Sequence, residues 1–160
     1  MLETNYQITF HSELAVDEKV IAGVKSVQDS FKWGDANFRT AQKRLSVATN
    51  PKIFVIEKAT RELLAYAVLF PEDGGWYLSQ IAVTLDLQGK GIGKAIMSKI
   101  FEEAVKYNIS TITLDVRGND EKKLKFYQNV ASGTTTVKKI HDGEYNNHDP
   151  KIKFEYKLKK

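Results

Sequence analysis

Three glycines and two lysines lie within six residues of the chain, in a segment whose chemistry suits an anionic ligand. Residues 88–94 read Gln-Gly-Lys-Gly-Ile-Gly-Lys. Glycine lets the backbone turn tightly and expose its N–H groups, and the two lysines add full positive charges. If a helix begins here, the positive end of its dipole adds to the attraction. The pattern predicts a cradle for a phosphate or a pyrophosphate.

Spacing separates this segment from two common phosphate-binding loops. A P-loop, GxxxxGK[ST], that ends at Gly93 and Lys94 would need glycine at Gln88 and serine or threonine at Ala95. A dinucleotide fingerprint, GxGxxG, that starts at Gly89 would need glycine at Lys94, and it belongs to alternating strands and helices. Neither motif fits. A glycine-rich turn that only connects two elements stays open as the structural alternative.

A strand and a helix must hold the segment in place, and hydrophobic periodicity predicts both. Residues 91–107 place apolar side chains at helical spacing and charged ones on the other face, which predicts a helix. Residues 76–83 predict the strand before the segment, and the clean alternation over 110–116 predicts a strand after the helix. Together they form one βαβ unit.

The rest of the pattern predicts the remaining elements of one α/β chain. Before the segment we expect a strand over 5–10 and two weakly periodic helices over 17–30 and 35–48. An antiparallel meander follows, with strands over 53–57, 63–70 and 76–83 and a turn at 71–75. After residue 116 we expect a short helix over 120–129, a strand over 134–140 and a polar loop over 141–150. A last strand with a lysine-rich outer face would follow over 151–159. No repeat or linker interrupts the 160 residues, so we expect a single domain over 1–160.

Composition excludes several classes of protein. The chain has no cysteine, which excludes disulfides, thiolate nucleophiles and Cys-ligated metals, and its 3 histidines lack metal-binding spacing, so no metal is expected. The net charge of +4 suits an anionic ligand but is too small and dispersed to indicate nucleic acid. No apolar run is long enough to span a membrane, and the first residues lack a secretory signal. We therefore expect a cytoplasmic protein.

Gln88, Gly91 and Gly93 form the pattern Q/R-x-x-G-x-G/A, and Val83 ends a small-apolar strand five residues before the glutamine. This pattern resembles the acetyl-CoA-binding motif of the GNAT superfamily of N-acetyltransferases, and the order of elements resembles that family over nearly the whole chain. The resemblance implies an α/β (α+β) chain with the GNAT-like acyl-CoA N-acyltransferase fold. Its sheet would be mixed and mostly antiparallel, with about seven strands, a splayed parallel pair formed by the fourth and fifth strands, and about four flanking helices.

The resemblance also implies how acetyl-CoA, as cosubstrate, would be bound. Its pyrophosphate would lie on residues 88–94, and its pantetheine arm would run beside the fourth strand and bond Ile81 and Val83. A backbone N–H near Ala82 or Val83 would stabilise the developing oxyanion. The cofactor-binding residues implied are Ile81, Ala82, Val83, Gln88, Gly89, Lys90, Gly91, Ile92, Gly93, Lys94 and Asn119.

Tyr127, which follows Phe126 in the predicted short helix, resembles the family's conserved tyrosine. By analogy with the family it would be the catalytic general acid that protonates the leaving thiolate of CoA. The alternative is an aromatic side chain that packs the helix onto the sheet. Asn119 stands eight residues before Tyr127 where the family spacing is seven, so Asp120 competes for the family's asparagine position.

The residues that handle the acceptor amine are less defined. A protonated amine must lose a proton before it attacks the thioester, but strand 76–83 carries no carboxylate. A water chain could act as the base, and so could four side chains: Asp35, Glu57, Asp115 and His141. The acceptor pocket would use an aromatic cluster and a polar hairpin loop, contributed by Phe31, Trp33, Phe38, Asp142, Glu144 and Asp149.

These observations predict an N-acetyltransferase that moves the acetyl group of acetyl-CoA directly to a primary amine of a small molecule or peptide. Nucleic acid and membrane are not expected partners, and a homodimer stays open. A non-catalytic acyl-CoA-binding sensor or regulatory GNAT-like domain is the alternative, which would bind CoA and turn over nothing. A nucleic-acid-binding protein would instead show steeply salt-dependent binding.

Overall fold

The structure is a computed structural model that describes residues 5–13, 16–131 and 135–158. These residues form seven strands, four α-helices and a short 3₁₀ helix, η2. In chain order the elements are β1 (Tyr6–His11), α1 (Glu18–Ser30), α2 (Asp35–Leu45), β2 (Lys52–Glu57), β3 (Leu63–Glu72), β4 (Gly75–Val83), η2 (Leu85–Leu87), α3 (Ile92–Lys106), β5 (Thr111–Arg117), α4 (Glu121–Asn129), β6 (Thr135–Glu144) and β7 (Pro150–Leu158). The predicted α/β fold class is confirmed.

The strands form one mixed sheet in the order β1-β2-β3-β4-β5-β7-β6. The pairs β1–β2, β2–β3, β5–β7 and β6–β7 are antiparallel. β4 and β5 are parallel, with Trp76 opposite Ile112 and Tyr77 opposite Thr113. These paired residues lie at the N-terminal ends of both strands. The parallel pair expected of the βαβ unit is therefore confirmed.

The chain divides into two compact units. The first comprises Met1–Phe70 and Leu78–Ile100, and the second comprises Pro71–Tyr77 and Phe101–Lys160, so β4 and α3 contribute residues to both. Each unit buries apolar side chains of its own. The prediction of a single domain over the whole chain stays a prediction.

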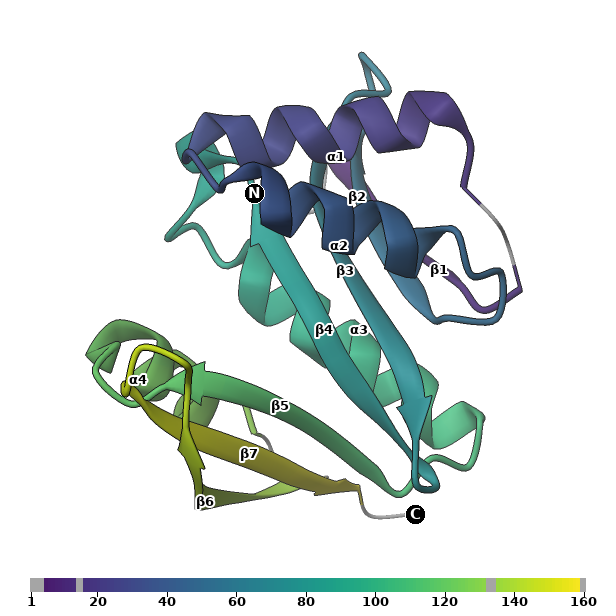
Figure 1. The fold of residues 1–160 in the computed structure, drawn as a ribbon. Coiled ribbons are helices and arrows are strands. Elements are labelled where there is room, and N and C mark those ends of the chain that lie inside the picture. The colour runs from purple at the N-terminus through teal and green to yellow at the C-terminus, as the bar shows by residue number, and fades with distance from the viewer. Residues whose placement is uncertain (1–4, 14–15, 132–134, 159–160) are drawn as a thin grey trace. The chain divides into compact units, whose positions relative to one another are not determined.

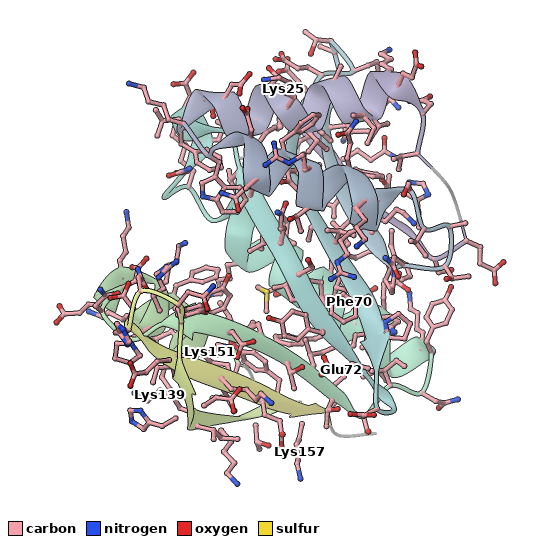
Figure 2. All side chains as sticks on the ribbon, viewed as in Figure 1. Lys25, Phe70, Glu72, Lys139, Lys151 and Lys157 are labelled. Atoms are coloured by element: carbon pink, nitrogen blue, oxygen red, sulfur yellow. The ribbon has the colours of Figure 1, made fainter. Side chains whose placement is uncertain are left out.

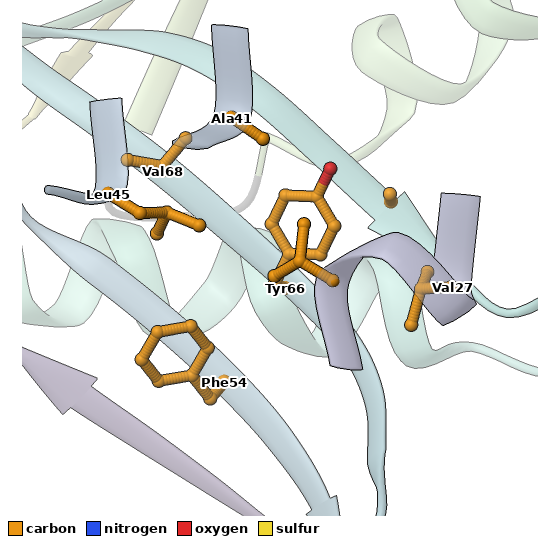
Figure 3. Close-up of a cluster of buried hydrophobic side chains, with 8 residues drawn as sticks. Val27, Ala41, Leu45, Phe54, Tyr66 and Val68 are labelled. Carbon is orange, nitrogen blue, oxygen red and sulfur yellow. The ribbon is translucent and has the colours of Figure 1, made fainter. Parts of the chain in front are cut away.

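In the first unit α1 and α2 cover one face of the strands, and the beginning of α3 covers the other (Figure 1). Side chains from the two helices and the sheet form a cluster of buried residues (Figure 3): Val24, Val27, Ala41, Leu45, Phe54, Tyr66, Val68 and Ala82. Valines three residues apart on α1 share one helix face, which is why both reach the sheet. Burial of an apolar side chain of this size stabilises the fold by about 1.5–3 kcal/mol. This core fixes the end of β4 beneath α1 and α2.

A buried lysine holds the turn that follows α2. The side chain of Lys52 is fully buried, and its Nζ donates hydrogen bonds to the carbonyl oxygens of Val47 (2.9 Å), Ala48 (3.2 Å) and Asn50 (2.7 Å). These carbonyls belong to the turn that follows Leu45, and hydrogen bonds from a cation to such oxygens are strong. Its neighbour across the sheet is His11. Burial, followed by the charge of Lys52, lowers the pKa of His11.

In the second unit aromatic rings pack α4 and the end of α3 onto β7. The ring of Phe101 lies 5.0 Å from that of Tyr156, and the ring of Tyr127 lies 5.9 Å from that of Phe154. Leu114 lies opposite Phe154 and shares its buried face. Of the hairpin lysines labelled in Figure 2, Lys151 and Lys157 alternate with the buried residues of β7, whereas Lys139 of edge strand β6 pairs with Phe154. One face of this sheet therefore carries the helices, and the other carries Thr113 and Asp115 of β5.

Three predicted boundaries differ from the structure by two residues or more. α2 ends at Leu45 rather than at residue 48, and β3 continues through Pro71 and Glu72, so the turn into β4 narrows to residues 73–74. β6 extends to Glu144, where a polar loop was expected, because strand pairing uses backbone groups and tolerates polar side chains. An irregularity between His141 and Glu144 accompanies this pairing. The predicted ends at residues 134 and 159 lie outside the described residues.

Candidate functional site

The glycine-rich segment forms a tight turn between β4 and α3. Gly89 and Gly91 have φ angles of +79° and +89°, in the left-handed region that disfavours a Cβ atom. A Cβ built on either glycine would meet nothing within 4 Å. Backbone conformation, rather than crowding by the protein, therefore requires glycine here, and the space beside the turn is open.

Gln88 closes this turn onto the end of β4. Its side-chain Nε2 donates a hydrogen bond of 2.9 Å to the carbonyl oxygen of Val83. The side chain is exposed at the surface, so the bond acts on the shape of the loop more than on the core. The structure thus gives the glutamine of the motif a loop-organising contact, which sequence spacing did not indicate.

The backbone and charges of this segment suit an anion. The helical ladder of α3 starts with the N–H of Ala95 donating to the carbonyl of Gly91 at 3.0 Å, and N–H groups in the first turn of a helix have no intrahelical acceptor. That first turn contains no acidic residue. Lys90 and Lys94 are both exposed at the surface. Dipole, amide groups and full charges all favour a phosphate at this end of α3.

Along β4, the backbone groups of successive residues point alternately toward β3 and toward the opposite edge of the strand. The N–H of Thr84 donates to the carbonyl of Leu64 in β3 at 2.9 Å. Groups two residues apart share an edge, so Ala82 also faces β3, whereas Ile81 and Val83 turn their N–H and C=O groups to the opposite edge. Of the two predicted oxyanion donors, this alternation favours Val83 over Ala82.

Ser30 is a residue that sequence analysis missed. Its Oγ donates to the carbonyl of Val27 (2.6 Å) and accepts the N–H of Leu85 (2.9 Å). The end of α1 is thereby tied to the segment that leads into the glycine turn. Nothing in the sequence indicates this contact, because 55 residues separate the two partners.

Tyr127 is buried in the second unit, with 8% of its surface exposed. Its backbone carbonyl accepts a hydrogen bond from the Tyr156 hydroxyl, and its ring contacts Phe126 and Phe154. Burial, followed by the negative charge of Asp120, raises the pKa of the Tyr127 hydroxyl. The phenol is therefore protonated at neutral pH, and its ring packs the helix as the structural alternative required.

Asn119 and Asp120 both have roles of their own in the structure. The Nδ2 of Asn119 donates to Oδ1 of Asp149 at 3.2 Å. Asp120 is the N-cap of α4, since its side chain accepts the N–H of Lys123 at 3.1 Å. Each side chain thus already stabilises local structure, and a contact of Asn119 with acetyl-CoA stays a prediction.

The four candidate bases differ in their surroundings. Asp35 and His141 are exposed at the surface and Glu57 is partly exposed. Asp115 is also partly exposed, but its Oδ2 accepts a hydrogen bond of 2.7 Å from the Tyr77 hydroxyl, and its Oδ1 is buried. Burial, followed by this hydrogen bond, raises the pKa of Tyr77. Asp115 is therefore the candidate whose carboxylate is held in one orientation.

The side chains predicted for the acceptor pocket are held by local contacts. The rings of Phe31 and Trp33 meet edge to face at 5.2 Å in the turn between α1 and α2. On the hairpin, Asp149 pairs with Arg117 at 2.9 Å. The other predicted acids also have partners, Glu144 with His148 (3.3 Å) and Asp142 with Lys153 (3.9 Å).

Two further features bear on the type of site. The described residues contain no group of three or more His, Cys, Asp or Glu side chains that could hold a metal ion. Among the helices of the described part of the chain, none is long and apolar enough to cross a membrane. The glycine turn is the best-defined candidate for a ligand site in the described residues.

The fold and the glycine turn point to an acetyltransferase. Residues 13–131 match the sequence profile of the acetyltransferase (GNAT) family, and the chain belongs to this family. The match includes β4, the glycine turn, α3, β5 and α4. The family expected from the sequence is thus confirmed.

Relatives and solved structures agree with this assignment. The chain is 24% identical over 114 residues to the [ribosomal protein bS18]-alanine N-acetyltransferase of Escherichia coli K12, covering 69% of this chain and 70% of that protein. Its fold is similar to that of an IAA acetyltransferase from Bacillus cereus (TM-score 0.70, 17% identity, 96% and 99% of the two chains). It is also similar to a GNAT family acetyltransferase from Elizabethkingia anophelis with acetyl-CoA bound (TM-score 0.65, 16% identity, 96% and 99% of the two chains).

Proposed function

We propose that this enzyme transfers the acetyl group of acetyl-CoA to a primary amine of a small molecule or peptide by direct attack. Acetyl-CoA supplies an activated thioester. The observation that carries the proposal is the glycine turn, where two left-handed glycines precede a helix whose first turn holds lysine and no acid. That arrangement suits the pyrophosphate of CoA. The chain's membership of the acetyltransferase family supports the same assignment.

Within the first unit, β4 and the turn would align the donor. Gln88, Gly89, Lys90, Gly91, Ile92, Gly93 and Lys94 would surround the pyrophosphate. Ile81 and Val83 would bond the pantetheine arm, since their backbone groups point away from β3. The carbonyl of Val83 already accepts one bond from Gln88, and a carbonyl oxygen has two lone pairs. The Val83 N–H is then the best candidate to stabilise the oxyanion.

Within the second unit, Tyr127 would act as the general acid. The neutral amine forms a new N–C bond to the carbonyl carbon and its nitrogen releases one proton to solvent. The C–S bond breaks, and the departing thiolate takes the proton of the Tyr127 hydroxyl. Because its pKa is raised, the phenol is protonated when the thiolate forms. The phenolate then regains a proton from solvent. The enzyme needs no cysteine for this route, and the chain has none.

The test is the variant Tyr127→Phe, which keeps the ring and removes the hydroxyl. We expect kcat to fall by about 10²- to 10⁴-fold while the affinity for acetyl-CoA stays nearly unchanged. Tyr107→Phe, at a tyrosine that is 50% exposed, is the matched control and should retain activity. Wild-type turnover in Tyr127→Phe would show that the ring only packs α4 and that the proton comes from elsewhere.

A further inference from the structure

A network of buried polar side chains joins both N-terminal helices to β4 in the first unit. Gln28 of α1, Tyr66 of β3 and Gln80 of β4 are all buried, and Tyr66 belongs to the cluster drawn in Figure 3. The Nε2 of Gln28 donates to the Tyr66 hydroxyl, which donates in turn to Oε1 of Gln80 at 2.8 Å. The Nε2 of Gln80 donates to the carbonyl of Asn37 in α2 at 2.9 Å. The network therefore ties β4 to the helices on either side of the α1–α2 turn, residues 31–34.

Stability alone does not account for this network. The Oε1 of Gln28 is buried and has no hydrogen-bond partner among the described residues. A buried network with an unpaired atom is less stable than apolar side chains that fill the same volume. What the hydrogen bonds add is direction, since each one fixes the position of its two partners. Burial raises the pKa of Tyr66 to about 12, so its hydroxyl keeps the proton that it donates to Gln80.

The backbone of Gln28 holds the α1–α2 turn directly. Its carbonyl accepts the N–H groups of Phe31 (3.3 Å) and Trp33 (3.1 Å). Between these two residues Lys32 has a φ of +60°, in the left-handed region that disfavours a side chain. A backbone in such a region persists only where surrounding contacts determine it. The shape of the turn therefore depends on where the network holds Gln28.

The α1–α2 turn lies against the C-terminal end of β4. Ser30, the last residue of α1, accepts the N–H of Leu85 at 2.9 Å, just past the end of that strand. The rings of Phe31 and Trp33 are partly exposed, and both pack against the cluster that contains Ala82. The turn thus brings two aromatic side chains to the part of β4 that would hold the acetyl thioester.

We propose that Gln28, Tyr66 and Gln80 are positioning residues that hold the α1–α2 turn as one preformed wall of the acceptor site. They act through the turn and not by contact with the reacting atoms. The inference rests on the proposed function, because it needs an amine that approaches the thioester at β4. It goes further by separating the two substrates: the network fixes the side of the acceptor, whereas the glycine turn binds acetyl-CoA.

The first part of the test is amide hydrogen exchange, measured by NMR on the whole chain without ligands. Tyr66→Phe keeps the ring and removes the hydroxyl at the centre of the network. We expect the amides of Phe31 and Trp33 to exchange about fivefold to a hundredfold faster, the range for loss of a buried hydrogen bond. The matched control is Asn50→Leu, which removes a bond from a buried side chain to the Arg44 carbonyl at the other end of α2. It should leave both rates unchanged.

The second part compares the two substrates. With an amine that supports turnover, Tyr66→Phe should raise the KM for the amine by about fivefold to a hundredfold. The Kd for acetyl-CoA should change by less than about twofold, because the glycine turn does not depend on the network. Asn50→Leu should change neither constant. A purely structural role of Tyr66 would affect both substrates alike.

Unchanged exchange at Phe31 and Trp33, or an equal loss of affinity for the amine and for acetyl-CoA, would overturn the proposal. If Tyr66→Phe does not fold, Gln80→Leu takes its place with the same expected results, since it removes the bonds to Tyr66 and to the Asn37 carbonyl. Hydrogen exchange needs no turnover. Faster exchange in a chain that acetylates no amine would therefore contradict the proposed function and leave the network's hold on the turn standing.

Discussion

Substitution at Gly91 separates backbone strain from ligand binding. Gly91 has a φ of +89°, and Gly143 in the β6–β7 hairpin has a φ of +85°; a Cβ on either meets nothing within 4 Å. Alanine at either position should therefore cost only the left-handed strain, about 1–2 kcal/mol. For a chain of this length that lowers the melting temperature by about 2–8 °C. Gly143→Ala is thus a matched control for Gly91→Ala.

Aspartate at position 91 adds a negative charge beside the expected pyrophosphate. At about 4 Å the repulsion is about 1–4 kcal/mol between the dielectric limits of water and a protein surface, which weakens binding roughly 5- to 700-fold. At 100 times the wild-type Kd, acetyl-CoA stabilises the native state by about 2.7 kcal/mol, but a hundredfold weaker variant would gain only about 0.4 kcal/mol.

Thermal unfolding with and without acetyl-CoA measures both effects. We expect Gly91→Ala and Gly143→Ala to melt earlier but to keep the full upward shift with acetyl-CoA. Gly91→Asp should lose from about a third to nearly all of that shift. A full shift in Gly91→Asp would refute the assignment of the turn to the pyrophosphate. A lost shift in Gly143→Ala would show that the strain alone disturbs binding.

Two further predictions concern Gln88 and His11. Gln88→Leu removes the hydrogen bond to the Val83 carbonyl, so the free energy of unfolding should fall by about 0.5–1.5 kcal/mol. Isothermal titration calorimetry should also show weaker binding of acetyl-CoA. Gln42→Leu on the exposed face of α2 should change neither quantity, and equal effects of the two substitutions would contradict the loop-closing role of Gln88. For His11, the folded state has the lower pKa, so the unfolded state binds more protons as the pH falls below the ordinary value of 6.5. The free energy of unfolding, measured with urea, should therefore decrease as the pH falls below 6.5, and His11→Phe should show a shallower decrease. Equal slopes in the two proteins would contradict a lowered pKa of His11.

The regular elements were predictable from the sequence because their patterns are strong. Seven apolar positions at helical spacing defined α3, and the alternation of Ile112, Leu114 and Val116 defined β5. The glycines at 89 and 91 were predictable for a different reason, since closely spaced glycines before a helix indicate a turn that needs positive φ. Local sequence carries this information by itself.

The contacts that connect distant segments were not predictable. Lys52 follows Asn50-Pro51 and has the sequence context of a surface lysine. It is nevertheless fully buried, and carbonyls of the turn after α2 accept hydrogen bonds from its Nζ. The bond from Tyr77 to Asp115 joins residues 38 apart. Its existence depends on the parallel register of β4 and β5, which periodicity predicts only as an adjacency. Such side chains acquire their roles from tertiary structure alone.

The central claim is that the chain acetylates a primary amine with acetyl-CoA bound at the glycine turn. Thiol release from acetyl-CoA, measured across a panel of primary amines that spans small molecules and peptide N-termini, tests it most directly. We expect at least one amine to support CoA release by the wild-type chain, and we expect Gly91→Asp to need far more acetyl-CoA to reach the same rate. A chain that binds acetyl-CoA in the turn but releases no CoA with any amine would contradict the claim and indicate a non-catalytic sensor.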